Sequence, residues 1–343
     1  MIKDQIKTGI IGFGLSGKVF HAPFLHTHKG FKLEKIVERK SKESKKIYPY
    51  VEVVSDYKNL VNDKELDLIV ICTPNTLHAP MAKECLEAGK HVIIEKPFTP
   101  TAKEADELIK LAEKAERNIF VYHNRRWDGD FMTLKKIIDE KILGDIYEYE
   151  AHFDRYTPDW DSDSWRDKDI AGGGILFDLG AHLIDQAMYL FGYPKKVTAN
   201  IQAQRKNSPV DDYFHLELEY PKLKVILTAG MMVKELGPRF TLKGNKGTYK
   251  KSGIDPQEDL LKAGLMPGTT NWGKEKKENW GIMDVAIDGK HSVYQTETLA
   301  GNYMGFYDNV YDVIINNAEM VVKQKEARNV IKIIEMAFTD SKK

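Results

Sequence analysis

The sequence predicts an α/β protein in which a doubly wound parallel sheet is followed by an α/β region with a large, mainly antiparallel open sheet. Short β-branched runs alternate with charged helical patterns up to residue 123, which is typical of a parallel sheet covered on both faces. From residue 124 the apolar and polar residues alternate over long stretches, which indicates antiparallel strands with one open face. The chain has 343 residues, enough for two domains, and we expect these to span 1–123 and 124–343.

The predicted elements follow this change of pattern along the chain. The first domain is expected to hold a helix over 103–116 and five strands, at 7–12, 33–37, 67–72, 91–95 and 119–122. The second is expected to hold helices over 130–140 and 327–338 and strands at 146–156, 196–204, 214–220 and 223–229. The segment 253–301 is rich in glycine, proline and polar residues, so we expect long loops there.

Composition argues against several classes of protein. Basic and acidic residues number 51 each, so no net charge attracts nucleic acid or an anionic membrane surface. No apolar run approaches the roughly 18 residues of a membrane helix, and the charged start of the chain does not resemble a secretory signal. Cys72 and Cys85 form neither a disulfide framework nor a metal-binding pattern. We expect a cytoplasmic protein that binds neither nucleic acid nor membrane.

A glycine-rich motif follows the first predicted strand. Gly12-Phe13-Gly14-Leu15-Ser16-Gly17 matches G-x-G-x-x-G between a strand and a helix, the context in which this pattern binds a dinucleotide. The first glycine allows a tight turn, the second lets main-chain amides approach a pyrophosphate, and the third lets the helix pack on the strand. We expect a Rossmann domain in which these six residues contact the cofactor. The alternative is a glycine-rich turn without a ligand.

The end of the second predicted strand bears on the choice of cofactor. A carboxylate there binds the ribose hydroxyl of NAD, whereas basic side chains favour the 2′-phosphate of NADP. The sequence offers Glu38 for the first role and Arg39, Lys40 and Ser41 for the second. We favour NADP as the cofactor, and NAD is the alternative. The structural interpretation is that these residues form a solvated charged turn and contact no cofactor.

Two more strand ends are expected to face the cofactor. Ligands of an open parallel sheet bind beyond the carboxyl ends of its strands. Glu95-Lys96-Pro97 follows the fourth predicted strand, and Lys96 is placed to stabilise a developing alkoxide on a substrate. The third strand is followed by further candidate cofactor contacts, namely Thr73, Pro74, Asn75 and His78.

The second domain contains a candidate proton acceptor. Asp178 and His182 are four residues apart after the glycine run at 172–174, so a helical turn would present both on one side. An imidazole that titrates near neutrality suits alcohol oxidation, and a nearby carboxylate would orient it. The structural alternative makes His182 a core histidine and Asp178 a helix cap. Trp165 and Arg166 are further candidates for substrate binding. Trp165 would form an aromatic wall of the site, and the guanidinium fork of Arg166 would bind substrate hydroxyls. The alternative is that both residues are structural.

Together these motifs resemble the Gfo/Idh/MocA family of nicotinamide-dependent oxidoreductases. The resemblance rests on the glycine turn, on Glu95-Lys96-Pro97 and on Asp178-x-x-x-His182-x-x-Asp185, and it runs from Thr8 to Ser341. It implies that Lys96, Asp178 and His182 are catalytic, that Asn124, Arg125 and Tyr156 bind substrate, and that the open sheet supports homodimers or homotetramers. Other motifs, including residues 122–128, 213–216 and 253–259, are similar to the NADP-dependent scyllo-inositol 2-dehydrogenases of that family.

The resemblance implies oxidation of a secondary hydroxyl of a cyclic polyol, such as scyllo-inositol, by reversible hydride transfer to NADP. His182 would remove the hydroxyl proton while Asp178 holds the imidazole. No metal is expected. Two alternatives remain: a related dehydrogenase or reductase acting on an aldose or keto sugar, and a dinucleotide-sensing regulator without catalytic activity.

Overall fold

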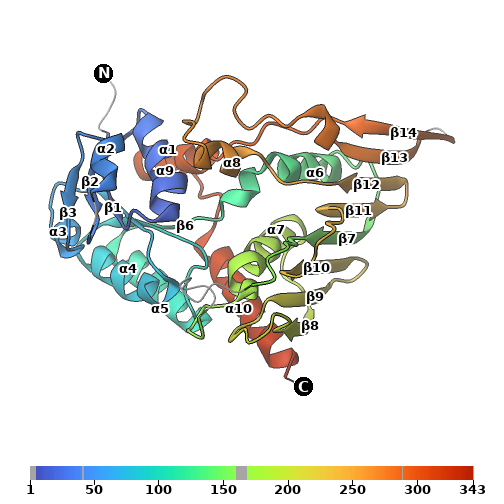
Figure 1. The fold of residues 1–343 in the computed structure, drawn as a ribbon, viewed down its shortest axis with the longest axis horizontal. Coiled ribbons are helices and arrows are strands. Elements are labelled where there is room, and N and C mark those ends of the chain that lie inside the picture. Colours follow the sequence, from blue (N-terminus) through green and yellow to red (C-terminus); the bar gives the residue numbers. More distant parts are fainter. Residues whose placement is uncertain (1–4, 41, 160–167, 288, 343) are drawn as a thin grey trace. The chain divides into compact units, whose positions relative to one another are not determined.

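The computed structural model describes residues 5–40, 42–159, 168–287 and 289–342, and Figure 1 shows its ribbon. The chain forms two compact units. Unit 1 consists of Met1–Asn124, Gln257–Trp272 and Tyr303–Arg328, and unit 2 consists of Arg125–Pro256, Gly273–Asn302 and Asn329–Lys343. Each unit therefore combines three stretches of chain, and the part after residue 256 contributes to both.

Unit 1 is built on a six-stranded parallel sheet in the order β3-β2-β1-β4-β5-β6. This order places a topological switch point between β1 and β4, as in doubly wound dinucleotide-binding sheets. All four residues of β4 are buried, because helices on both faces exclude water from a central strand. The strands are β1 (Ile6–Ile11), β2 (Phe31–Val37), β3 (Glu52–Val54), β4 (Leu68–Ile71), β5 (His91–Ile94) and β6 (Ile119–Val121).

Helices cover both faces of this sheet, with α4 and α5 on one side and α1 and α9 on the other (Figure 1). α5 begins at a capping box in which Thr101 and Glu104 satisfy each other's main-chain N–H groups. The returning α8 (Gln257–Lys262) packs against η1, which directly follows the glycine turn. The other helices of unit 1 are η1 (Gly17–His21), α1 (Ala22–Thr27), α2 (Glu43–Ile47), α3 (Lys58–Val61), η2 (Asn75–Leu77), α4 (His78–Glu87), α5 (Ala102–Ala115) and α9 (Met304–Asn316).

Unit 2 is built on an eight-stranded sheet in the order β14-β13-β12-β11-β7-β10-β9-β8. Neighbouring strands are antiparallel except β7 and β10, which run parallel. Every second residue of β9 is buried, as expected when one face of a sheet is packed. The strands are β7 (Ile146–His152), β8 (Lys196–Gln202), β9 (Tyr213–Glu219), β10 (Lys224–Gly230), β11 (Phe240–Gly244), β12 (Gly247–Lys251), β13 (Gly281–Ile287) and β14 (Lys290–Thr296).

The helices of unit 2 gather on one face of that sheet. η5 (Leu176–Gly180) packs on β9 and β10, α7 (Ala181–Phe191) packs on β10, and Figure 1 shows α6 and α10 on the same side. The predicted fold class, a parallel sheet followed by a mainly antiparallel one, is confirmed. The remaining helices are η3 (Asn124–Trp127), α6 (Gly129–Asp139), η6 (Lys277–Asn279) and α10 (Gln324–Asp340), which begins in unit 1. None of the described helices is long and apolar enough to cross a bilayer.

The expectation of long loops over 253–301 is wrong for much of that segment. It contains α8 and the hairpin of β13 and β14, which extends one edge of the eight-stranded sheet. Most residues of β14 stay partly or fully exposed because an edge strand has only one neighbour. A polar edge strand therefore has a composition close to that of a loop.

Candidate active site

The glycine turn has the shape of a phosphate cradle. Gly12 has a φ of +97°, and a Cβ atom there would lie 2.7 Å from the carbonyl oxygen of Cys72 at the end of β4. A Cβ atom on Gly17 would lie 2.2 Å from the carbonyl oxygen of Gly12. A Cβ atom on Gly14 would meet nothing within 4 Å, so the middle of the turn faces open space. The outer glycines are thus needed to close the turn, and its centre is open to a pyrophosphate.

Glu38 at the end of β2 is turned toward its own chain. Its carboxylate accepts hydrogen bonds from the main-chain N–H groups of Glu43 and Ser44, each at 2.9 Å, and from the Ser44 hydroxyl. The side chain is only 8% exposed. The next residues, Arg39 and Lys40, are exposed, while Ser41 lies outside the described residues. The acid is thus used to shape the loop, whereas the basic side chains face solvent.

Two buried side chains organise the ends of β4 and β5. His78 directs Nδ1 at the carbonyl oxygen of Pro97, at 3.0 Å, and Nε2 at that of Thr73, at 2.9 Å. It thereby links the segment after β4 to the segment after β5. Burial lowers the pKa of His78, while hydrogen bonds to the main chain oppose that shift. Thr73, Pro74, Asn75 and His78 lie together at this edge, and Asn75 is 1% exposed.

Glu95 is the second of these side chains. Its Oε2 accepts the main-chain N–H of Lys96 at 3.0 Å, and its Oε1 meets Nε2 of His21 at 2.9 Å and the hydroxyl of Ser16. Burial acts to raise the pKa of Glu95, but the hydrogen bond and charge of His21, then Ser16, lower it to about 2. Glu95 is therefore a carboxylate at any working pH. Lys96 is half-buried at the carboxyl end of the sheet, where a cofactor would bind.

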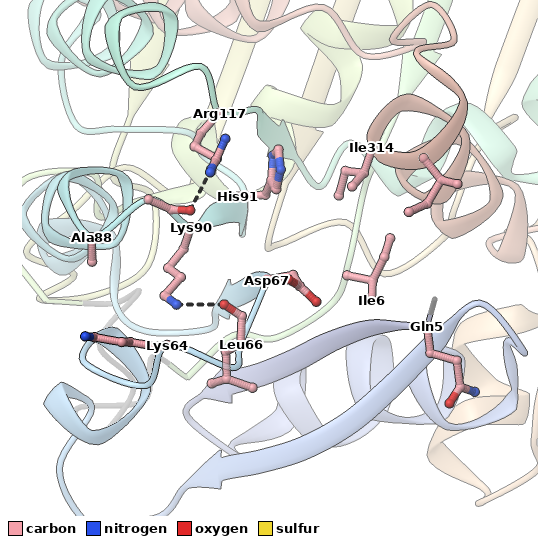
Figure 2. Close-up of a pocket in the computed structure, with 12 residues that line it drawn as sticks. Gln5, Ile6, Lys64, Leu66, Asp67, Ala88, Lys90, His91, Arg117 and Ile314 are labelled. Atoms are coloured by element: carbon pink, nitrogen blue, oxygen red, sulfur yellow. Dashed lines mark hydrogen bonds between the residues drawn. The ribbon is translucent and has the colours of Figure 1, made fainter. Parts of the chain in front are cut away.

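A cavity of about 480 Å³ lies at the opposite ends of the strands of this parallel sheet, where β4 and β5 begin (Figure 2). Two of its cationic side chains, Lys90 and Arg117, are bonded to the main chain. Lys90 donates to the carbonyl oxygen of Leu66 at 2.7 Å, and Arg117 Nε donates to that of Gly89 at 2.5 Å. Burial and the charge of Arg117 lower the pKa of His91 to about 4, so this ring is neutral. These side chains hold the surrounding loops together. None of the site residues predicted from the sequence lines this cavity.

In unit 2, Asp178 and His182 lie where a π-helix passes into an α-helix. Asp178 is the third residue of η5, and His182 is the second residue of α7. Such π-helical turns are rare and are frequent at functional sites. His182 is 4% exposed, and Asp178 is half-buried. The structure therefore keeps both groups on one continuous helical segment, as the spacing predicts.

The residues predicted to bind substrate have different surroundings. Arg125 is buried in η3, with its guanidinium 3.3 Å from Asp128 and over the ring of Phe153. Tyr156 is exposed and forms an isolated β-bridge with Met232. Asn124 is buried and is the last residue of the first stretch of unit 1. Trp165 and Arg166 lie outside the described residues.

Asp211 and an ion pair in unit 2 were not singled out from the sequence. Asp211 accepts the N–H of Leu176 at 2.8 Å and so holds the start of η5. Burial raises its pKa to about 6, against main-chain hydrogen bonds that lower it. Arg126 forms two hydrogen bonds to Asp185 of α7, at 2.7 and 2.9 Å. Both contacts join residues 35 or more positions apart, and no local pattern in the sequence reports them.

No group of three or more histidine, cysteine, aspartate or glutamate residues is arranged to hold a metal ion within the part of the chain that the structure describes.

Comparison with family models covers nearly the whole chain. Residues 6–123 match the model of an oxidoreductase family with an NAD-binding Rossmann fold. Residues 135–343 match the model of the C-terminal α/β domain of the same family. The chain belongs to the Gfo/Idh/MocA oxidoreductase family. The resemblance inferred from the motifs is confirmed, and so is the expectation of an enzyme.

Relatives of known name have related but different substrates. The chain is 41% identical over 339 residues to the scyllo-inositol 2-dehydrogenase (NADP(+)) IolW of Bacillus subtilis, covering 99% of this chain and 94% of that one. It is 28% identical over 211 residues to the D-glucoside 3-dehydrogenase of Escherichia coli, covering 60% of each. The solved structure of the Bacillus subtilis oxidoreductase yvaA is 40% identical with a TM-score of 0.95, covering 99% of this chain and 96% of that one. The two dehydrogenases are named for different substrates, and the solved structure shares the fold of this chain.

Proposed function

We propose that this enzyme oxidises a secondary hydroxyl of a cyclic polyol, with scyllo-inositol as the substrate to test first, and transfers the hydride to NADP in a reversible reaction. Two observations support the proposal. The glycine turn and the Lys96 segment lie at the same edge of the parallel sheet, in a domain that matches the family's NAD-binding model. The chain is also 41% identical to an NADP-dependent scyllo-inositol 2-dehydrogenase. Substrates change on one fold through small changes of a pocket, so the polyol is part of the proposal.

The assignment of NADP rests on the end of β2. Glu38 is buried and its oxygens already accept main-chain N–H groups, so a ribose hydroxyl would have to compete with them. Arg39 and Lys40 are exposed beside it and offer charge-assisted hydrogen bonds to a 2′-phosphate. The open centre of the glycine turn would hold the pyrophosphate.

The chemistry of this chain is proton transfer and charge stabilisation. When bound, the nicotinamide supplies the hydride acceptor for oxidation and the donor for reduction. His182 takes the proton of the substrate hydroxyl, and Asp178 stabilises the imidazolium that forms. Lys96 stabilises the negative charge that develops on the substrate oxygen. General acid–base assistance of this kind contributes roughly 10²–10⁴-fold to a rate.

An aldose or keto sugar as substrate is the second candidate, because a relative 28% identical to this chain is a glucoside dehydrogenase. A panel measured at the absorbance band of reduced nicotinamide separates the candidates. We expect turnover of scyllo-inositol with NADP, and at least tenfold lower kcat/KM with NAD. Turnover of glucosides or aldoses in place of inositols would overturn the polyol assignment. Cofactor binding without turnover on the whole panel would favour a dinucleotide-sensing regulator.

A further inference from the structure

A chain of buried and partly buried hydrogen bonds runs from the glycine turn to the main chain of Lys96 and on to α9. It links Ser16, Glu95, His21 and Tyr307, all within unit 1. Glu95 is its centre, because one oxygen meets Ser16 and His21 and the other accepts the N–H of Lys96. The segments that the chain joins are the turn, η1, the end of β5 and α9.

The hydrogen atoms of this network can be assigned from its acceptors. The Tyr307 hydroxyl lies 2.7 Å from the carbonyl oxygen of Phe20, which can only accept, so Tyr307 donates there. The same hydroxyl lies 2.9 Å from Nδ1 of His21. Nε2 of His21 faces a carboxylate oxygen, so Nε2 carries a hydrogen and donates it to Glu95. The ring of His21 is therefore held at both nitrogens.

The packing around His21 fixes its ring. The side chain is fully buried, and its ring lies 4.4 Å, centroid to centroid, from that of Tyr122. Tyr122 donates to the same Phe20 carbonyl oxygen as Tyr307, at 3.0 Å. A ring held on this many sides can serve as a rigid support for the Glu95 carboxylate. A buried charge is also costly to leave unpaired, which couples Glu95 to His21.

We infer that His21 is a positioning residue for Lys96: through Glu95 it fixes the main chain of Lys96 to the dinucleotide-binding turn. The inference rests on the proposed role of Lys96 in the reaction. The lysine head group is carried on four rotatable bonds, so its reach to a substrate oxygen depends on where its Cα is held. A displacement of about 1 Å of a reacting group costs roughly 100-fold in rate. Neither His21 nor Glu95 has to touch the substrate for this effect.

The test replaces His21 by an aromatic ring that cannot form these hydrogen bonds, His21→Phe, beside His26→Phe as the matched control. His26 lies five residues further on, is exposed, and bonds only to Tyr50 in the described structure. We expect His21→Phe to lower kcat roughly 100-fold while the Kd of NADPH, measured by fluorescence, changes by less than about threefold. His26→Phe should leave kcat within about twofold. An unchanged kcat in His21→Phe would overturn the inference.

A double-mutant cycle with Lys96→Ala separates positioning from a general structural role. If His21 acts through Lys96, adding His21→Phe to Lys96→Ala should lower kcat by less than about twofold, because the single losses are not additive. Fully additive losses would contradict the inference while leaving Lys96 in the chemistry. A fully active Lys96→Ala variant would instead refute the proposed function.

Tyr307→Phe provides a milder change in case His21→Phe does not fold. It keeps the bond between His21 and Glu95 and removes the contacts of the Tyr307 hydroxyl with Nδ1 and with the carbonyl oxygen of Phe20. We expect a roughly two- to tenfold loss of kcat. Combined with Lys96→Ala, this change should add little further loss of kcat, as for His21→Phe. Nitrogen-15 NMR of labelled protein should show a hydrogen on Nε2 of His21, facing Glu95. A ring with its hydrogen on Nδ1 alone would overturn the inference that His21 supports Glu95.

Discussion

Two glycine-rich segments, one in each unit, lead into the same local structure. Gly12–Gly17 is followed by the π-helix η1 and then α1, and the glycine run at 172–174 is followed by the π-helix η5 and then α7. Each contains a glycine in the left-handed region, Gly12 at φ +97° and Gly174 at φ +91°. Each also carries a buried histidine at the π-to-α junction, His21 in one case and His182 in the other.

The two histidines differ in where their acidic groups come from. His21 meets a carboxylate from another strand end, Glu95, whose pKa is lowered to about 2. The acid proposed to act with His182 is Asp178, four residues earlier in the chain, while Asp211, whose pKa is raised to about 6, supports the start of η5 from outside. A histidine paired with a permanent carboxylate is suited to hold structure, whereas a proton acceptor must gain and lose its proton. Burial and local geometry alone do not distinguish the two roles.

The largest expected effect is at His182. His182→Asn should lower kcat by roughly 10²–10⁴-fold, because the proton acceptor is lost, and leave the Kd of NADPH within about twofold. His215→Asn on β9 is the matched control, since this half-exposed histidine bonds to Thr228 of the neighbouring strand. Steady-state kinetics with scyllo-inositol measure both. Near-normal turnover in His182→Asn would assign the proton transfer to another group.

A smaller effect is expected at the end of β2. Replacing Arg39 and Lys40 together by alanine should reduce kcat/KM for NADP roughly 10- to 100-fold and change that for NAD little, because charge-assisted bonds to the 2′-phosphate are lost. Lys46→Ala, an exposed lysine of α2, is the control. Equal losses with both cofactors would show that these side chains do not select the phosphate.

The smallest expected effect is a change in stability at Asp211. Burial raises the pKa of Asp211 to about 6, so its contribution to the free energy of unfolding is complete below pH 4 and is lost as pH rises through 6. The quantity to follow is the free energy of unfolding of the wild type minus that of Asp211→Asn. This difference should fall by about 1–3 kcal/mol between pH 4 and pH 7. Urea unfolding at several pH values measures it. The exposed Asp169→Asn should show no such trend, and a flat difference for Asp211→Asn would contradict the assigned role.

The motifs at the carboxyl edge of the parallel sheet could be predicted from the sequence because each follows a buried, β-branched strand. Strand order then brings the glycine turn, residues 73–78 and Glu95-Lys96 to one edge. The orientation of Glu38 could not be predicted, since it depends on N–H groups presented by the first residues of α2, Glu43 and Ser44. The same holds for the contacts of His21, because its partners Glu95 and Tyr307 lie 74 and 286 residues away along the chain.

In unit 2 the sequence located Asp178 and His182 but not what supports them. Four-residue spacing indicates a shared helical side, yet it does not distinguish an α-helix from the π-helix observed in η5. Asp211 reaches η5 from the loop before β9, and that contact depends on tertiary packing. Strand β14 was missed for a related reason, since an edge strand lacks the second row of buried neighbours that marks a strand.

Transfer of deuterium tests the central claim most directly. Scyllo-inositol deuterated at its ring carbons is incubated with NADP and the enzyme, and the reduced cofactor is analysed by mass spectrometry and NMR. We predict one deuterium at C4 of the nicotinamide per ketone formed, with a slower rate than for unlabelled substrate. Reduced cofactor without deuterium, or no reduced cofactor while other sugars react, would contradict hydride transfer from this polyol.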